Sequence, residues 1–394
     1  MKLKSITSHL LFRIVLAMAL GIVCAWFFPD WLGRIFATFN AIFSQLLGFV
    51  IPLIILGFVA PAIAEVGTSA GRMLLVTALI AYGSTLVAGF SSYWISEWLF
   101  PMMITGGQAS ETVGEAASLA PYFTVEMPPL MAVMTALVSA FILGLGVAAL
   151  PSGNKLMPIL SEFRSIVSMV IEKVIIPLLP IYIFGIFLNM TYSGEVASIL
   201  STFAKIIGVI FLMHILWLII QFCAVAPMSP GSRNPFRLLG TMLPAYFTAL
   251  GTQSSAATIP VTLRQAEKLG VDPAVAGFTV PLCATIHMSG STLKIVSCAV
   301  ALMITRGMPY DIGMFASFIC MLGVTIIAAP GIPGGCIMAS LGLLTSMLGF
   351  SDADCALMIA LYIAMDSFGT ACNVTGDGAI AIAVARIFRK RKQE

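Results

Sequence analysis

"DSFGTACNVTGDG", residues 366–378, places two carboxylates, a threonine and an asparagine inside one of the last hydrophobic segments of the chain. On a helix of about 3.6 residues per turn, Asp366, Thr370, Asn373 and Asp377 lie on one face. A carboxylate at membrane depth is costly unless it is paired, so a stripe with two of them indicates a functional site. Its hard oxygen donors suit an amino group or a sodium-like ion rather than a transition metal. For Asp377, a solvated position near the basic C-terminal cluster is the alternative.

The segment belongs to a chain with the composition of an integral membrane protein. Of its 394 residues, 59% are hydrophobic and 9% are charged, and the mean hydropathy is +1.04. Helices of about 20 apolar residues can cross the hydrocarbon core, and runs of suitable length lie at 10–28, 41–64, 73–92, 129–150, 165–189 and 203–226. No outward-alternating pattern recurs, so the sequence predicts an all-α membrane protein rather than a barrel.

The basic residues predict the orientation in the membrane. Lys2, Lys4 and Arg13 flank the first apolar run, and a basic cluster at 386–392 ends the sequence. The positive-inside rule therefore predicts that both termini are cytoplasmic, in a multi-pass protein of the plasma membrane that contacts lipid. The net charge of +3 is too small to indicate nucleic-acid binding.

Two later segments predict broken helices. "YFTALGTQSSAATIP" (246–260) and "AAPGIPGGCIMAS" (328–340) insert small residues, glycine and proline into apolar surroundings. Proline removes a backbone donor and glycine weakens a helix. Irregular backbone at membrane depth occurs where protein or a water-filled cavity satisfies its polar groups. Two such breaks in one half of a chain are typical of a transporter site built on inverted repeats.

A second polar stripe lies in "CATIHMSGSTLKIVS" (283–297). His287, Ser291 and Lys294 occur at i, i+4 and i+7, which predicts one face of a continuous helix. A buried histidine is more often a hydrogen-bonded core residue than a proton carrier. The lysine lies too far from either end of the apolar run to reach the interface, so we expect it to pair with Asp366 or Asp377.

The motifs "QSSAATIPVTLRQAEKLGVD" (253–272), "FTVPLCATIHMSG" (278–290), "GIPGGCIM" (331–338) and "NVTGDG" (373–378) together resemble the glutamate transporter family, the dicarboxylate and amino acid:cation symporters. The resemblance implies eight transmembrane helices, inverted repeats and two re-entrant helical hairpins, near 236–262 and 312–345. It also implies a homotrimer with scaffold helices in 1–70 and 129–195. A transport domain, 71–100 with 200–394, would move through the membrane as an elevator.

The same resemblance assigns the site. Asp366 would hold a substrate amino group, Asn373 the α-carboxylate, and Asp377 a sodium ion together with Asn373 and Met288. Further substrate contacts would come from the hairpin tips, the last helix and the segment 283–297, at Ser254, Ser255, Ser291, Gly331, Gly334, Gly369 and Thr370.

The departures from the family pattern change the expected substrate. Members that carry acidic substrates have an arginine where this chain has Gly369, and a second arginine where it has Gln253. Loss of a guanidinium removes a bidentate clamp for a carboxylate. We therefore expect a small neutral amino acid, with Ser291 near its side chain. A dicarboxylate or cystine carrier of the same family is the alternative.

A third departure concerns coupling. The family motif "NMDG" is replaced by His287, Met288, Ser289 and Gly290, which removes side-chain ligands for sodium. We expect fewer sodium sites than is usual in the family, with the Lys294 ammonium or a proton on His287 in place of one sodium ion.

Other classes of protein fit the sequence less well. An intramembrane aspartyl protease needs two carboxylates that share a proton, whereas eleven residues of one helix separate Asp366 and Asp377 by about 16 Å. The sequence therefore predicts that the chain is not an enzyme. A channel-like anion conductor is a closer alternative, because hairpins also build filters.

Overall fold

The computed structural model describes residues 10–68, 72–104, 119–151, 154–194, 196–327, 329 and 334–388. Within these ranges the chain is helical and contains no strand, which agrees with the predicted all-α class. The first half forms α2 (Leu10–Cys24), α3 (Asp30–Thr68), α4 (Arg72–Met103), α5 (Val133–Ala149), α6 (Leu156–Val170), α7 (Ile176–Tyr192) and α8 (Val196–Val225). A short π-helical segment, Ile171–Ile175, joins α6 to α7 without a break.

The second half consists of shorter helices. They are α9 (Pro235–Thr252), α10 (Ser255–Lys268), α11 (Pro273–Ile286), α12 (Ser289–Arg306), α13 (Ile312–Ile327), α14 (Gly335–Leu348), α15 (Asp352–Ala364) and α16 (Asp366–Phe388). Several of them begin at a residue that caps the first turn. Asn234 accepts hydrogen bonds from Phe236 N and Arg237 N at the start of α9, and Ser351 forms a capping box with Asp354 in α15, so free backbone N–H groups are satisfied there.

Six helical segments of the described residues are long and apolar enough to cross a membrane. The longest single helix, α3, has 39 residues and includes Pro52 and Pro61. Its length of about 58 Å exceeds a hydrocarbon core of about 30 Å, so α3 must tilt or extend beyond the core. The most deeply buried of the six is Pro273–Arg306, because 89% of its most apolar stretch lies inside the protein. This segment, α11 with α12, is therefore the centre of the fold.

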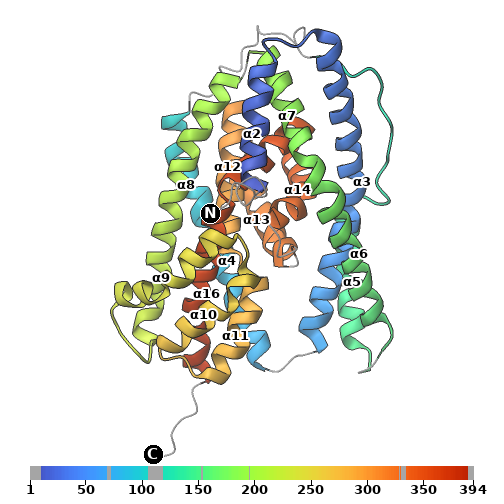
Figure 1. Ribbon diagram of the computed structural model, residues 1–394. Coiled ribbons are helices and arrows are strands. Elements are labelled where there is room, and N and C mark those ends of the chain that lie inside the picture. The colour runs from blue at the N-terminus through green and yellow to red at the C-terminus, as the bar shows by residue number, and fades with distance from the viewer. Residues whose placement is uncertain are drawn as a thin grey trace, which may run out of the picture.

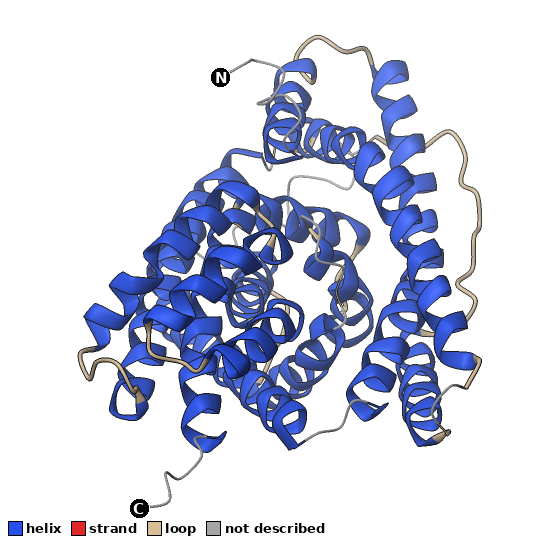
Figure 2. Ribbon diagram, turned by 60° about the horizontal axis from the view of Figure 1, so that its bottom comes forward, coloured by secondary structure: helices blue, strands red, loops and turns tan. Residues whose placement is uncertain are grey.

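The helices form two packed groups. In one group α3 packs against α5, α6 and α7, and α2 packs against α7. In the other, α12 packs against α4, α8 and α16, and α16 also contacts α9, α10 and α11. Figure 1 shows α3, α5 and α6 along one side of the molecule and α8 to α11 with α16 along the other. Figure 2, in which the lower end of Figure 1 comes forward, shows that the elements joined by the loops are helices.

The structure corrects the prediction of a continuous helix through 283–297. Helix α11 ends at Ile286, His287 has extended φ and ψ of −96° and 96°, and α12 begins only at Ser289. The polar residues of this segment thus lie on both sides of a break. The predicted interruption in 246–260 is present at Gln253 and Ser254, between α9 and α10. In 328–340, α13 ends before this segment at Ile327 and α14 begins at Gly335, while residues 328 and 330–333 lie outside the described residues.

Candidate functional site

Asp366 and Lys294 form a buried ion pair at the centre of the protein. Asp366 is the first residue of α16, and its Oδ1 accepts a hydrogen bond of 2.8 Å from Lys294 Nζ. Its Oδ2 accepts one of 2.9 Å from the backbone N–H of Gly334, at the start of α14. Lys294 is fully buried, and its Nζ lies 3.3 Å from the centroid of the Tyr362 ring. Of the two carboxylates considered from the sequence, Asp366 is thus the partner of Lys294.

Gly369 makes this arrangement possible. A Cβ atom at position 369 would lie 2.8 Å from Lys294 Nζ and 2.9 Å from its Cε, so any side chain there would force the lysine to shift. The glycine that stands in place of the family's arginine therefore accommodates an ammonium group from the protein itself.

His287 and Asp377 form a second buried pair. His287 Nδ1 lies 2.9 Å from Asp377 Oδ1, and both side chains are almost fully buried. On the other side of the ring, His287 Nε2 lies 3.0 Å from Ser84 Oγ in α4. Gln221 in α8 donates through Nε2 to the same hydroxyl, at 3.0 Å. Gly376 leaves room for the imidazole, because a Cβ there would lie 2.7 Å from His287 Cε1.

Asn373 lies between the two pairs and caps α12. Its Oδ1 accepts hydrogen bonds from Gly290 N at 2.7 Å and Ser291 N at 3.3 Å. Its Nδ2 donates to Ser291 Oγ at 3.1 Å and lies 3.5 Å from Met288 Sδ. All polar atoms of Asn373 are thus used inside the protein, where they satisfy free N–H groups of the first turn of α12.

The turn between α9 and α10 reaches the start of α16. Gln253 has a left-handed conformation with φ of 54°, and its Nε2 donates a 2.7 Å hydrogen bond to Ser367 Oγ. Ser254 caps α10 by accepting from Ala257 N at 3.2 Å, and Ser255 is buried. Thr370 is buried on the same face of α16 as Asp366, and no hydrogen bond to its hydroxyl is present among the described residues.

The structure brings together most of the residues predicted from the sequence. Asp366, Gly369, Asn373, Asp377, Met288, Ser291, Lys294, His287 and Gly334 are connected by the contacts above. Ser289 is fully buried, and its hydroxyl has no partner in the described part of the chain. Gly331 lies outside the described residues.

Three contributors were not predicted: Ser84, Gln221 and Tyr362. Gln221 had a signal in the sequence, because it lies seven residues after His214 within the apolar helix α8, and both are buried. His214 Nε2 lies 3.0 Å from the carbonyl oxygen of Gly290. Nothing in the sequence singles out Ser84 or Tyr362, because a serine or tyrosine in an apolar helix is ordinary.

The predicted sodium ligands do not form an open oxygen cage in this geometry. Asn373 Oδ1 already accepts two N–H groups, and Asp377 Oδ1 faces His287. Met288 offers sulfur, a poor ligand for a hard cation. Among the described residues there is no group of three His, Cys, Asp or Glu side chains that could hold a metal ion. The side-chain oxygens predicted as sodium ligands are thus partly used by contacts within the protein.

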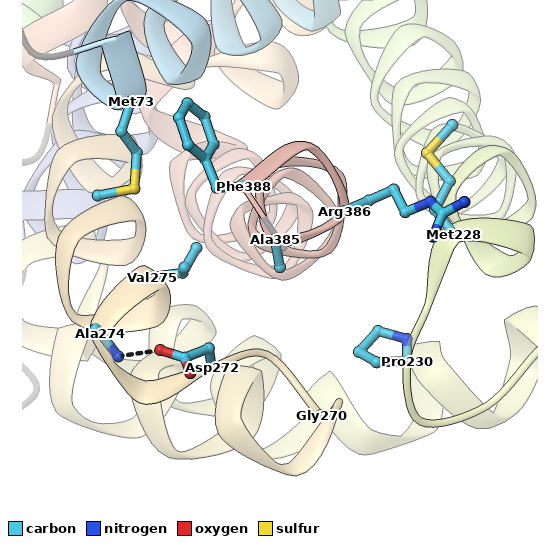
Figure 3. A pocket seen from close by; sticks show the side chains of 10 residues that line it. All are labelled: Met73, Met228, Pro230, Gly270, Asp272, Ala274, Val275, Ala385, Arg386 and Phe388. Atoms are coloured by element: carbon cyan, nitrogen blue, oxygen red, sulfur yellow. Dashed lines mark hydrogen bonds between the residues drawn. The ribbon is translucent and has the colours of Figure 1, made fainter. Parts of the chain in front are cut away.

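An apolar layer separates the His287–Asp377 pair from a cavity at the end of α16. The cavity has a volume of about 720 Å³ and is lined by residues of four segments, among them Met73, Val275 and Phe388. Figure 3 shows these side chains around the end of α16, with Asp272 accepting a hydrogen bond from Ala274 N. The same three residues pack on the buried cluster Cys283, Ile380 and Val384. This side of the cavity wall is therefore backed by an apolar cluster.

Long apolar helices surround buried ion pairs, and these pairs lie where helices begin or are interrupted. Such an arrangement is typical of the class of multi-pass membrane transporters. The chain matches the Sodium:dicarboxylate symporter family over residues 10–387 and belongs to it. This membership confirms the resemblance to the glutamate transporter family and the prediction that the chain is not an enzyme.

Two relatives named as serine/threonine transporters cover most of the sequence, and a third relative covers part of it. The chain is 28% identical over 387 residues to the serine/threonine transporter SstT of Acinetobacter baumannii, covering 94% of this chain and 95% of that protein. The identity to the protein of the same name in Acinetobacter baylyi is 27% over 389 residues, with 94% and 96% covered. Excitatory amino acid transporter 4 of mouse is 34% identical over 163 residues, which cover 41% of this chain and 29% of the mouse protein.

Proposed function

We propose that the protein is a proton-coupled symporter for a small solute with one carboxylate group. The observation that carries the proposal is the buried pair of His287 and Asp377, whose facing atoms lie 2.9 Å apart where the sequence predicted a sodium ligand. Imidazole changes charge near neutral pH more readily than other side chains. With a proton on His287 the pair is neutral, and without it Asp377 leaves a single negative charge.

The neighbours of His287 can form hydrogen bonds with its imidazole ring in both protonation states. The Ser84 hydroxyl can donate to an unprotonated Nε2 or accept from a protonated one. Gln221 Oε1 is buried without a partner, so rotation of this amide would place an acceptor near Nε2. A site that satisfies its hydrogen bonds in both states can gain and lose a proton during transport without a large penalty.

The solute is expected to have no second acidic group. Gly369 and Gln253 stand at the positions of the two expected arginines, and the Lys294 ammonium is already paired with Asp366. This disfavours the alternative of a dicarboxylate. Neutral amino acids, the substrate class predicted from the sequence, belong to the proposed class, and the relatives named as serine/threonine transporters support this part of the prediction.

We further propose the family architecture for this chain. It comprises eight transmembrane helices, two re-entrant hairpins built by α9–α10 and α13–α14, inverted repeats, and cytoplasmic termini. Scaffold helices in 1–70 and 129–195 would hold a homotrimer, and the transport domain in 71–100 and 200–394 would move as an elevator. The two packed helix groups support this division. Native mass spectrometry of the purified protein would give the trimer mass, and a monomer would contradict it.

The test of the coupling is uptake into proteoliposomes under a proton gradient, a sodium gradient, or neither. We expect the proton gradient to drive accumulation and the sodium gradient to add little. The variant His287→Gln should lose the response to pH, whereas His214→Gln, a second buried histidine that contacts a backbone carbonyl, should keep it.

Accumulation that follows sodium alone, and is unchanged in His287→Gln, would contradict the proposal. Passive flux that does not saturate with solute concentration would instead support a channel-like conductor.

A further inference from the structure

We infer that the substrate site selects small carboxylates that carry no ammonium group, such as short 2-hydroxy or 2-oxo acids. This inference rests on the proposed function, and within the proposed class of solutes with one carboxylate it departs from the neutral amino acids predicted from the sequence. The feature that carries it is Lys294, which supplies from the protein the ammonium that Asp366 binds.

The first step concerns the buried carboxylates. Three aspartates are buried in the described part of the chain, and each has a basic partner: Asp354 pairs with Arg306, Asp366 with Lys294 and Asp377 with His287. A charged ammonium in a dry site needs a carboxylate close by. A substrate with an ammonium group would find no free carboxylate partner here.

The second step concerns Lys294 itself. Its Nζ is held by Asp366 Oδ1 at 2.8 Å and by the face of Tyr362 at 3.3 Å. Asp377, the other carboxylate on α16, is taken by His287. If an incoming ammonium displaced Lys294 from Asp366, one of the two cations would remain buried without a counterion, and the two like charges would repel each other.

The third step concerns what remains to bind a carboxylate. An ammonium has three N–H donors, and Asp366 Oδ1 uses one of them in the described contacts. The hydroxyl of Thr370, one turn along α16 from Asp366, makes no hydrogen bond among the described residues. Charge-assisted donors of this kind bind carboxylates well, and the start of α14 adds its positive helix end beside Asp366. The free capacity of the site therefore suits an anion.

The experiment compares matched pairs of ligands that differ only in the amino group. Binding of L-lactate and L-alanine, and of glycerate and L-serine, would be measured with the purified full chain in nanodiscs by equilibrium titration and by thermal shift. We expect the amine-free member of each pair to bind at least about tenfold more tightly. Equal binding, tighter binding of the amino acids, or binding of neither member would overturn the inference.

A variant reverses the preference if the mechanism is correct. Lys294→Ala frees Asp366, so L-alanine should gain affinity and L-lactate should lose it. Lys205→Ala is the matched control, because Lys205 is exposed and donates to the carbonyl of Met103. If Lys294→Ala does not fold, the double variant Lys294→Met with Asp366→Asn removes both charges, and binding that still favours lactate tenfold in this variant would overturn the role of Lys294.

The outcome separates this inference from the proposed function. Gradient-driven accumulation of serine would leave the proton-coupled symporter intact and overturn the selection against amines. Tight binding of lactate with no proton-driven uptake would support the selection and contradict the coupling.

Discussion

At the scale of single residues, the protein places two basic side chains at membrane depth and pairs each with an aspartate of α16. A small residue makes room for each of them, Gly369 beside Lys294 and Gly376 beside His287. Burial of a charged pair is weak evidence for stability, because the cost of removing water offsets the attraction. We therefore attribute these pairs to function.

The contact at Gly369 gives the first prediction. Gly369→Ala should destabilise the protein by about 1–3 kcal/mol, because the new methyl group overlaps the Lys294 ammonium. The same change made together with Lys294→Ala should cost much less. Apparent Tm values of the four proteins in this double-mutant cycle would measure the coupling. Gly83→Ala is the control, because no atom lies within 4 Å of a Cβ at that position. Additive effects would show that the two residues do not share this space.

Asn373 gives a second prediction, because it caps the start of a helix in a buried place. Another asparagine, Asn234, caps a helix start at the surface and serves as the control. Asn373→Ala leaves two N–H groups of α12 without an acceptor in a buried place, at a cost of about 1–3 kcal/mol. Asn234 caps α9 in an exposed position, where water can replace the lost acceptor, so Asn234→Ala should cost less. A larger loss of apparent Tm for Asn234→Ala would contradict this account of Asn373.

At the scale of elements, the break between α11 and α12 organises the site. The break itself contains no proline or glycine, and the nearest are Pro281 and Gly290. It is held by contacts from distant segments instead: Asn373 caps the start of α12, and Asp377 holds His287 in the gap. This is why the sequence did not predict it, whereas the glycine, proline and small residues of 246–260 identified the interruption between α9 and α10.

The packing of α5 on α3 gives a prediction with a control in the same helix. A Cβ at Gly144 would lie 2.8 Å from the carbonyl oxygen of Ala60 and 2.7 Å from Ile63 Cβ, whereas a Cβ at Gly146 would meet nothing within 4 Å. Close approach of helices through small residues is a common basis of packing in membranes. Gly144→Ala should lower the apparent Tm, and Gly146→Ala should leave it unchanged or raise it slightly. Equal effects would show that the two helices can separate without cost.

At the scale of the whole molecule, the charges of the site predict how transport responds to voltage. A carrier with His287 protonated and an anionic substrate bound has the same net charge as the empty, unprotonated carrier, because Lys294 and Asp366 cancel in both. The loaded carrier and the returning empty carrier then move the same charge in opposite directions, so one complete cycle transfers no net charge. Uptake in proteoliposomes should not change when a potassium diffusion potential is imposed with valinomycin. Strong acceleration by a negative interior would show that net positive charge moves inward, either because extra cations accompany an anionic solute or because the solute is zwitterionic.

The sequence predicted the class of fold and much of the site. Apolar runs identified the helices of the first half, although α3 begins at Asp30 rather than at 41, because its first turns carry polar residues that a hydropathy argument passes over. The runs at 10–28 and 129–150 contain α2 and α5, of 15 and 17 residues, which are shorter than the crossing helices predicted there. The stripe on α16 identified Asp366, Thr370, Asn373 and Asp377 as one face. The partners of these residues could not be derived in the same way. Whether Lys294 reaches Asp366 or Asp377 depends on how α12 lies against α16, and this depends on the break at His287.

The close contact between Gly369 and Lys294 also constrains the ancestry of the protein. A larger side chain at position 369 requires Lys294 to shift from its contact with Asp366, because a Cβ at 369 would lie 2.8 Å from Lys294 Nζ. A change from glycine to a larger residue therefore carries a cost in stability for as long as the lysine is present. We expect the two positions to change as a unit across related sequences, and chains with Lys294 and a bulky residue at 369 to be rare.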